Sequence, residues 1–308
     1  MNRRAVLAML GAAACWGIGT VVSKQAVVEV PPLTLLAAQL AVSVVFLAVL
    51  GRVRGQRLLP VRRAAPLVAL GILNPGLAYA LGLIGLSQIS ASLAVLLWAG
   101  EPILILGLAA ILLGERLETR VIALSTIAVT GLVVVIYDPA ATGSLPGVAV
   151  SIAGIGCCAV YAIATRRWLS DAGETLGVVL GQQAAALAFA IALVAASAWA
   201  GQPPIAAAIS PVGLASVAIS GLLYYAFAYL LYLSALRTLP ASAAAVAFYL
   251  IPLFGVGAAT VAGERLGPTQ ELGALVVIVA VAAVGLRIAG LRMTLARVSR
   301  VPPSRAVD

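Results

Sequence analysis

Long apolar runs, separated by short breaks, make up most of this chain. The breaks carry prolines, glycines or clustered arginines, which end helices. A helix needs about 20 apolar residues to cross the hydrocarbon core of a bilayer, and ten runs are near that length. The pattern therefore predicts an all-α integral membrane protein with ten transmembrane helices. The runs are 5–28, 33–51, 65–87, 89–113, 119–137, 146–168, 175–200, 211–236, 241–262 and 269–290.

The positions of the basic residues indicate the orientation of these helices. If all ten runs cross, every one of the 19 Lys and Arg residues except Lys24 and Arg265 falls on the side of the N-terminus. Cytoplasmic segments of membrane proteins carry such an excess of Lys and Arg. We therefore expect the N- and C-termini to be cytoplasmic.

Composition removes several other classes of function. Charged residues are 9% of the chain and hydrophobic residues 63%, whereas soluble domains have about 25% charged residues. The net charge of +9 comes from short clusters between apolar runs, so we expect no nucleic acid partner. The chain has no His, and Cys15, Cys157 and Cys158 all lie inside apolar runs. We expect no catalytic residue, no metal site, no cofactor and no disulfide framework.

Half of the chain repeats the other half. Ala91, Ser92 and Pro102 recur 150 residues later, and the Gly-Glu-Arg-Leu segment at 114–117 recurs at 263–266. We assign 1–140 to the first repeat, 145–292 to the second, and 293–308 to a basic cytoplasmic tail. Because each repeat holds five helices, the second must enter the membrane from the opposite side, which makes the repeats inverted. Such repeats favour alternating access to a site near the midplane, and a duplicated structural bundle is the alternative.

One carboxylate lies near the middle of the run 89–113. Glu101 comes immediately before Pro102, and an acidic residue at a helix centre costs roughly 2.5–3.5 kcal/mol. Its repeat position is Ile251, so the carboxylate is not needed to build the repeat. It either serves a role of its own, such as contact with a substrate amine or proton carrying, or is a protonated side chain hydrogen-bonded to a nearby helix.

Aromatic residues in several runs are candidates for the lining of a cavity. Three tyrosines in 211–236 follow a helical stripe at i, i+4 and i+7, which extends too far in depth for one interfacial belt. Trp16 heads a polar stripe that continues through Thr20, Ser23 and Lys24; the alternative is that its hydroxyls bond back to the helix and that Lys24 extends to the interface. The candidate substrate-binding residues are Trp16, Tyr79, Trp98, Glu101, Tyr161, Tyr225, Tyr229, Phe248 and Tyr249, with Tyr232 as a weaker one.

Three prolines lie inside apolar runs and are candidates for hinges. A proline frees a carbonyl one turn back and kinks its helix. Transmembrane prolines are common, so each either hinges a gate or shapes the fold alone. They are Pro75, Pro102 and Pro252.

The ordered pair of a proline followed by Gly-Glu-Arg-Leu resembles the EamA type of the drug/metabolite transporter superfamily. Here the pairs are Pro102 with 114–117 and Pro252 with 263–266. The resemblance covers residues 5–290 and implies ten helices in two repeats around a central cavity. It implies export of hydrophobic or aromatic amino acids across the bacterial inner membrane by alternating access, and we expect a monomer. The alternatives are export of another metabolite or an amphipathic drug and, from another class, an intramembrane enzyme.

Overall fold

The computed structural model describes residues 3–55, 65–113, 118–137, 143–165, 175–202, 208–236 and 250–298. Apart from an isolated bridge between Ile89 and Gly143, every element in these ranges is helical. The elements are α1 (Arg3–Glu29), α2 (Pro32–Val53), α3 (Ala65–Ala69), the π-helix η2 (Ile72–Leu77), α4 (Ala78–Gln88), α5 (Ala91–Trp98), α6 (Glu101–Leu113), α7 (Thr119–Tyr137), α8 (Leu145–Thr165), α9 (Thr175–Trp199), α10 (Pro211–Ser220), the π-helix η4 (Gly221–Phe227), α11 (Ala228–Leu236), α13 (Ile251–Val261) and α14 (Pro268–Val298).

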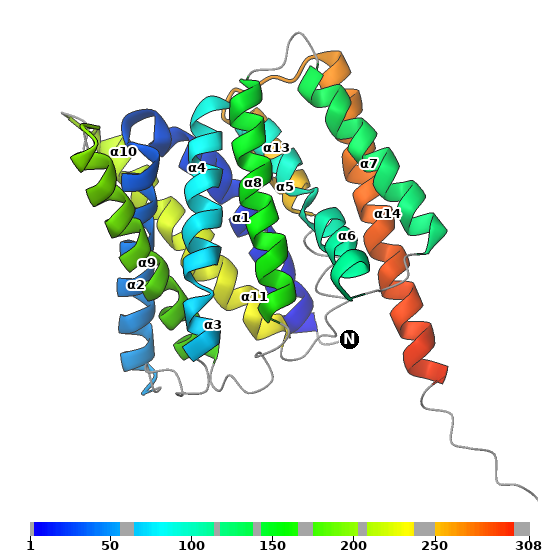
Figure 1. The fold of residues 1–308 in the computed structure, drawn as a ribbon, viewed down its shortest axis with the longest axis horizontal. Helices are drawn as coiled ribbons and strands as arrows, with labels where there is room; N and C mark the ends of the chain where they lie inside the picture. The colour runs from blue at the N-terminus through cyan, green and yellow to red at the C-terminus, as the bar shows by residue number, and fades with distance from the viewer. Residues whose placement is uncertain are drawn as a thin grey trace, which may run out of the picture.

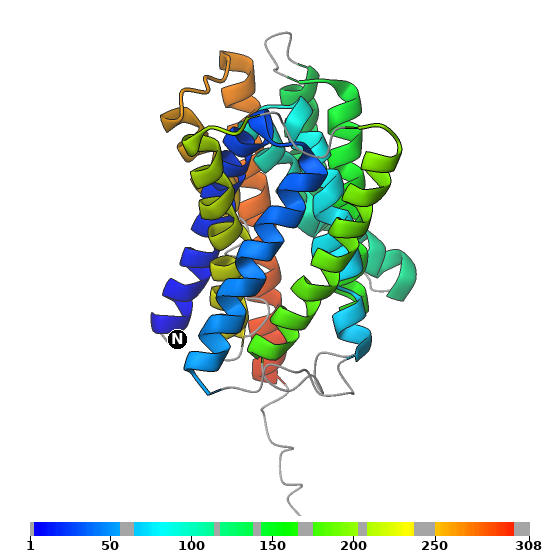
Figure 2. The ribbon, with the colours of Figure 1, turned by 90° about the vertical axis from the view of Figure 1, so that its left-hand side faces the viewer.

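The helices form one bundle with the character of a membrane domain. Seven of the described helical segments are long and apolar enough to cross a membrane, and shorter apolar helices accompany them. Large apolar side chains such as Val53, Ile111 and Val261 point away from the interior, as lipid-facing residues do. The start of α1 and the end of α14 lie at the same end of the bundle (Figures 1 and 2).

The predicted single helix 89–113 is wrong. The segment forms two helices, α5 and α6, with a break at Ala99 and Gly100, and the axis of α6 lies at an angle to that of α5 (Figure 1). Pro102 lies in the first turn of α6, where its missing N–H is not needed. Glu101 therefore begins a helix and does not lie in the middle of one.

Two other runs are interrupted at matching places. In 65–87, Asn74 has non-helical dihedral angles (φ −144°, ψ 119°) inside η2, directly before Pro75. In 211–236, η4 interrupts the helix although it contains no proline. The kink expected at Pro75 is confirmed, and the second interruption was not predicted.

The first helix of each half packs against the opposite half. α1 lies mainly against α10, α11 and α13, while α8 lies mainly against α4 and α6. The pairs α2 with α9, α5 with α13 and α7 with α14 also join the halves, and α2 and α9 run side by side in Figure 2. The two halves are thus interleaved and do not form separate lobes.

Two predicted boundaries differ from the structure or lie outside it. α14 extends to Val298, so the predicted helix 269–290 was too short and the predicted tail 293–308 begins inside a helix. In the predicted run 241–262, residues 241–249 lie outside the described residues, and α13 accounts for the helix from Ile251.

We expect Gly273→Ala to lower the free energy of unfolding by about 1–3 kcal/mol, the usual cost of overpacking. An added Cβ would lie 2.7 Å from Val135 Cγ2 and 3.0 Å from the Gly131 carbonyl oxygen, where α14 crosses α7. Gly156→Ala is the control, because nothing lies within 4 Å of an added Cβ there and alanine favours a helix by about 0.5–1 kcal/mol. Thermal unfolding in detergent measures both variants. Equal effects would contradict close packing of α7 and α14.

Candidate functional site

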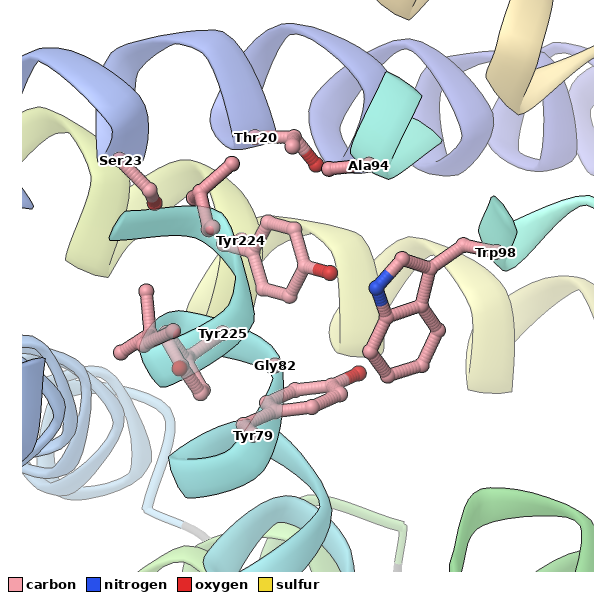
Figure 3. A pocket seen from close by; sticks show the side chains of 10 residues that line it. Thr20, Ser23, Tyr79, Gly82, Ala94, Trp98, Tyr224 and Tyr225 are labelled. Atoms are coloured by element: carbon pink, nitrogen blue, oxygen red, sulfur yellow. The ribbon is translucent and has the colours of Figure 1, made fainter. Parts of the chain in front are cut away.

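A pocket lies where the two halves meet, between α1, α4, α5 and η4 (Figure 3). Its volume is about 20 Å³, which is room for about one water molecule. A larger ligand therefore fits only after the surrounding helices separate. The lining residues are Thr20, Ser23, Tyr79, Gly82, Leu83, Leu86, Ala94, Trp98, Tyr224 and Tyr225.

Aromatic rings make up much of the lining. The Tyr79 ring centroid lies 5.6 Å from that of Trp98, 5.2 Å from that of Tyr224 and 5.4 Å from that of Tyr225. All three pairs are edge-to-face, an arrangement that ring quadrupoles favour. In Figure 3 the Tyr224 hydroxyl and the Trp98 indole nitrogen point toward one another across the pocket. The site therefore offers ring faces and a few polar groups to a ligand.

A pair of hydroxyls joins the two halves beside the pocket. The Tyr79 and Tyr229 hydroxyls lie 3.2 Å apart, and the two residues are 150 positions apart in the chain, which is the offset of the sequence repeat. The Tyr229 hydroxyl also donates at 3.4 Å to Oδ1 of Asn74, which lies in η2. Equivalent residues of the two repeats thus meet at this point.

Tyr224 is the pocket residue that the helical pattern missed. In a regular helix, Tyr225, Tyr229 and Tyr232 at i, i+4 and i+7 share one face, and Tyr224 points toward another. The wider turn of η4 brings Tyr224 and its neighbour Tyr225 to the same side. The adjacent pair of tyrosines was the available signal, but a regular helix was assumed.

Several predicted residues lie near the pocket without lining it. Trp16 packs edge-to-face on Tyr229 and Tyr232, with centroids 5.7 and 5.6 Å apart. Tyr161 donates to Gln182 Oε1 at 3.2 Å. The structure therefore brings Tyr79, Trp98 and Tyr225 into the pocket and leaves the other described aromatic candidates behind it.

Glu101 is half-buried and is not among the residues that line the pocket. It begins α6 just after the break that follows Trp98. It comes three residues after Trp98, and α6 packs against α8, so Glu101 lies beside the α5 end of the pocket wall.

Two further candidates, Phe248 and Tyr249, lie outside the described residues. Pro252 is described, and it lies in the first turn of α13. Within the described ranges, no three His, Cys, Asp or Glu side chains come together as metal ligands.

The polar stripe of α1 has a mixed outcome. Thr20 Oγ1 donates to the Trp16 carbonyl at 3.0 Å, as in the alternative interpretation, although Thr20 and Ser23 also line the pocket. Lys24 Nζ donates to the carbonyl of Leu86 in the last turn of α4 at 2.8 Å. The stripe therefore ties α1 to the pocket wall.

Buried glutamines support the interrupted helices, and sequence reasoning missed them. Gln182 Nε2 donates to the Leu67 carbonyl beside η2, and Gln183 Nε2 donates to the Tyr225 carbonyl within η4, both at 2.9 Å. Gln39 Nε2 donates to the hydroxyls of Ser23 and Ser220. An irregular backbone inside a membrane needs such partners. Three glutamines inside apolar runs were the signal that could have found them.

The comparisons with known proteins agree with this architecture. The profile of the EamA-like transporter family matches residues 3–137 and 145–286. A solved structure, described only as the crystal structure of a protein, matches with a TM-score of 0.66 and 20% sequence identity, over 97% of this chain and 100% of the other. At this identity it supports the fold alone. No curated protein matches the chain.

We expect Tyr229→Phe to lower the free energy of unfolding by about 1–3 kcal/mol, because it leaves two buried polar groups, the Tyr79 hydroxyl and Asn74 Oδ1, without this partner. Tyr79→Phe should cost less, since Tyr229 keeps its bond to Asn74. The double variant should cost less than the sum of the two. Thermal unfolding of the three variants measures the coupling, and strict additivity would show that the two hydroxyls do not interact.

Proposed function

Since the chain belongs to the EamA-like transporter family, we propose that it exports hydrophobic and aromatic amino acids across the bacterial inner membrane. Members of this family are multi-pass membrane transporters of small molecules and not enzymes. The observation that carries the proposal is the pocket between the halves, whose lining combines four aromatic rings with the hydroxyl side chains of Thr20 and Ser23. We further propose a resemblance to the aromatic amino acid exporter YddG, on the basis of Trp98, Tyr79 and the aromatic residues of the runs 146–168, 211–236 and 241–262.

The proposed architecture is ten transmembrane helices in two inverted repeats, 1–140 and 145–292, with both termini and the basic tail 293–308 in the cytoplasm. Contacts at matching positions support it. A side chain at Gly71 would clash with the backbone of Gln182, and one at Gly221, 150 residues on, with the backbone of Gln39. The C-terminal ends of α1 and α4 meet the N-terminal end of α8, so α8 runs opposite to α1.

Transport proceeds in the proposal by alternating movement of two groups of helices around the pocket. One group is α1 with α10, α11 and α13, and the other is α8 with α4, α5 and α6. The aromatic faces accept the apolar side chain of the substrate, whose burial provides roughly 1.5–3 kcal/mol, and the hydroxyls of Thr20 and Ser23 hold its polar end. The break between α5 and α6 beside Trp98, together with Pro75 and Pro252, supplies the points about which helices bend.

A second candidate is export of another small metabolite or an amphipathic drug by the same movement. The described lining of the pocket carries no charged side chain, and this favours ligands whose charge is small or is offset from outside the pocket. Glu101, close behind the rings, is the group that we propose for the substrate ammonium or for a proton. We propose that the protein acts as a monomer.

We expect Trp98→Ala to raise the KM for Phe and Trp about tenfold or more, because the lost ring contact is worth about the 1.4 kcal/mol that corresponds to a factor of ten. Thr, which has little apolar surface, should change much less. Transport of Phe, Trp, Leu and Thr into proteoliposomes measures this, with Trp199→Ala as the control, since Trp199 is 95% exposed at the end of α9. If the wild type transports none of the four, the amino acid assignment is wrong.

We expect Glu101→Gln to reduce transport at least tenfold and to flatten its dependence on an imposed pH gradient, because the amide can neither carry a proton nor offset an ammonium charge. Glu271→Gln is the control, as Glu271 is an exposed carboxylate in the first turn of α14. Transport with and without a pH gradient measures both variants. Unchanged rates and an unchanged pH dependence in Glu101→Gln would remove Glu101 from the mechanism.

A further inference from the structure

Two charged side chains hold the turn between α4 and α5 from outside. This turn lies at the end of the bundle where α1 ends and α13 leads into α14, which we call the outer end. Lys24 of α1 donates to the Leu86 carbonyl in the last turn of α4. Glu264, just after α13, accepts from the backbone N–H groups of Ala91 and Ser92 at 2.8 and 2.9 Å and from the Ser92 hydroxyl at 2.8 Å.

Each charge suits the helix end that it binds. The N-terminus of a helix is partly positive and its C-terminus partly negative, so the carboxylate stabilises the start of α5 and the ammonium the end of α4. In the first turn of α5, Ser90 Oγ accepts a hydrogen bond from the Leu93 N–H. The Ala91 and Ser92 N–H groups have no partner within the helix, and they donate to Glu264. The turn is therefore fully bonded only while both residues are in place.

These bonds join the two groups of helices that move in the proposed function. Lys24 and Glu264 belong to the group of α1 and α13, whereas α4 and α5 belong to the group of α8. Leu86 itself lines the pocket, and Ala91 lies seven residues before Trp98, about 10 Å along the helix toward the outer end. A substrate that leaves the pocket at this end must pass between these elements.

Beneath these bonds, α13 packs closely against α5. A Cβ added at Gly255 of α13 would lie 2.5 Å from Val95 Cγ1 of α5. A buried apolar cluster forms where α1, α5 and α13 meet, from Val21, Ala91 and Ala259. The outer end is thus closed by small apolar side chains and held by charged ones.

A second carboxylate offers a matched comparison. Glu29 accepts from the backbone N–H and the hydroxyl of Ser210, both at 2.7 Å, at the start of α10. This bond has the same chemistry and lies at the same end of the bundle. It joins α1 to α10, which belong to one group, so it stays intact when the groups separate.

We infer that Lys24 and Glu264 form a clasp that closes the outer end of the pocket and must release the α4–α5 turn before substrate can leave there. The clasp rests on the proposed function for its role in transport, but its effect on access to the pocket does not depend on the substrate. Its repeat counterparts Glu115, Ala241 and Ser242 lie outside the described residues.

Access of a thiol reagent to the pocket tests the clasp. In a chain whose three cysteines, Cys15, Cys157 and Cys158, are replaced by Ala, Ala94→Cys places a reporter in the pocket lining. A membrane-impermeant maleimide is added on the face that carries the α13–α14 turn. We expect Glu264→Ala to raise the labelling rate about tenfold, since it removes several charge-assisted hydrogen bonds, and Lys24→Met to raise it less. Glu29→Gln should leave the rate within about twofold of the parent.

Labelling that is unchanged in Glu264→Ala, or raised equally in Glu29→Gln, would overturn the clasp. A covalent link between the two sides of the clasp is a second test, independent of labelling. Ser92→Cys with Glu264→Cys, joined by a short bifunctional methanethiosulfonate, should block transport until a reductant cleaves the link, and transport by the cross-linked protein at the reduced rate would contradict the proposal. The labelling experiment needs no substrate, so its result does not depend on the amino acid assignment. Failure of the clasp and failure of the proposed function can therefore be distinguished.

Discussion

The absence of water in the hydrocarbon core is the constraint on which this structure depends. Every backbone N–H and carbonyl there needs a partner inside the protein, and an uninterrupted helix supplies them all. This chain interrupts its helices at η2, at η4 and between α5 and α6, all beside the pocket. Gln182 and Gln183 supply partners to carbonyls at the first two. The pocket exists because buried polar side chains stabilise the irregular backbone around it.

The exchange of first helices explains how two repeats can make one site. α1 lies with the second half and α8 with the first, so each of the two groups of helices that we propose to move contains helices from both halves. The pocket lies at the junction, with Tyr79 from the first half against Tyr224 and Tyr225 from the second. At the outer end the halves are joined by close packing of α5 on α13 and by the bonds from Lys24 and Glu264.

Much of the fold could be predicted from the sequence, because hydrocarbon thickness sets the length of apolar runs and the repeat sets their order. Tyr79, Trp98 and Tyr225, three of the predicted substrate-binding residues, line the same pocket, and their role in substrate binding stays a prediction. Regular helical spacing failed where the helices are irregular, and it missed Tyr224 and placed Glu101 in mid-helix. The bonds made by Glu264 could not be foreseen, because they join residues more than 170 positions apart in the chain.

The proposed function requires that an aromatic amino acid bind between the rings of the pocket. The most direct measurement is an experimental structure of the protein in lipid with a saturating concentration of phenylalanine. We expect density for the ligand between Trp98 and Tyr224, with Tyr79 beneath it, and a wider separation of α5 from η4 than in the present structure. An empty pocket, or phenylalanine bound elsewhere in the bundle, would contradict it.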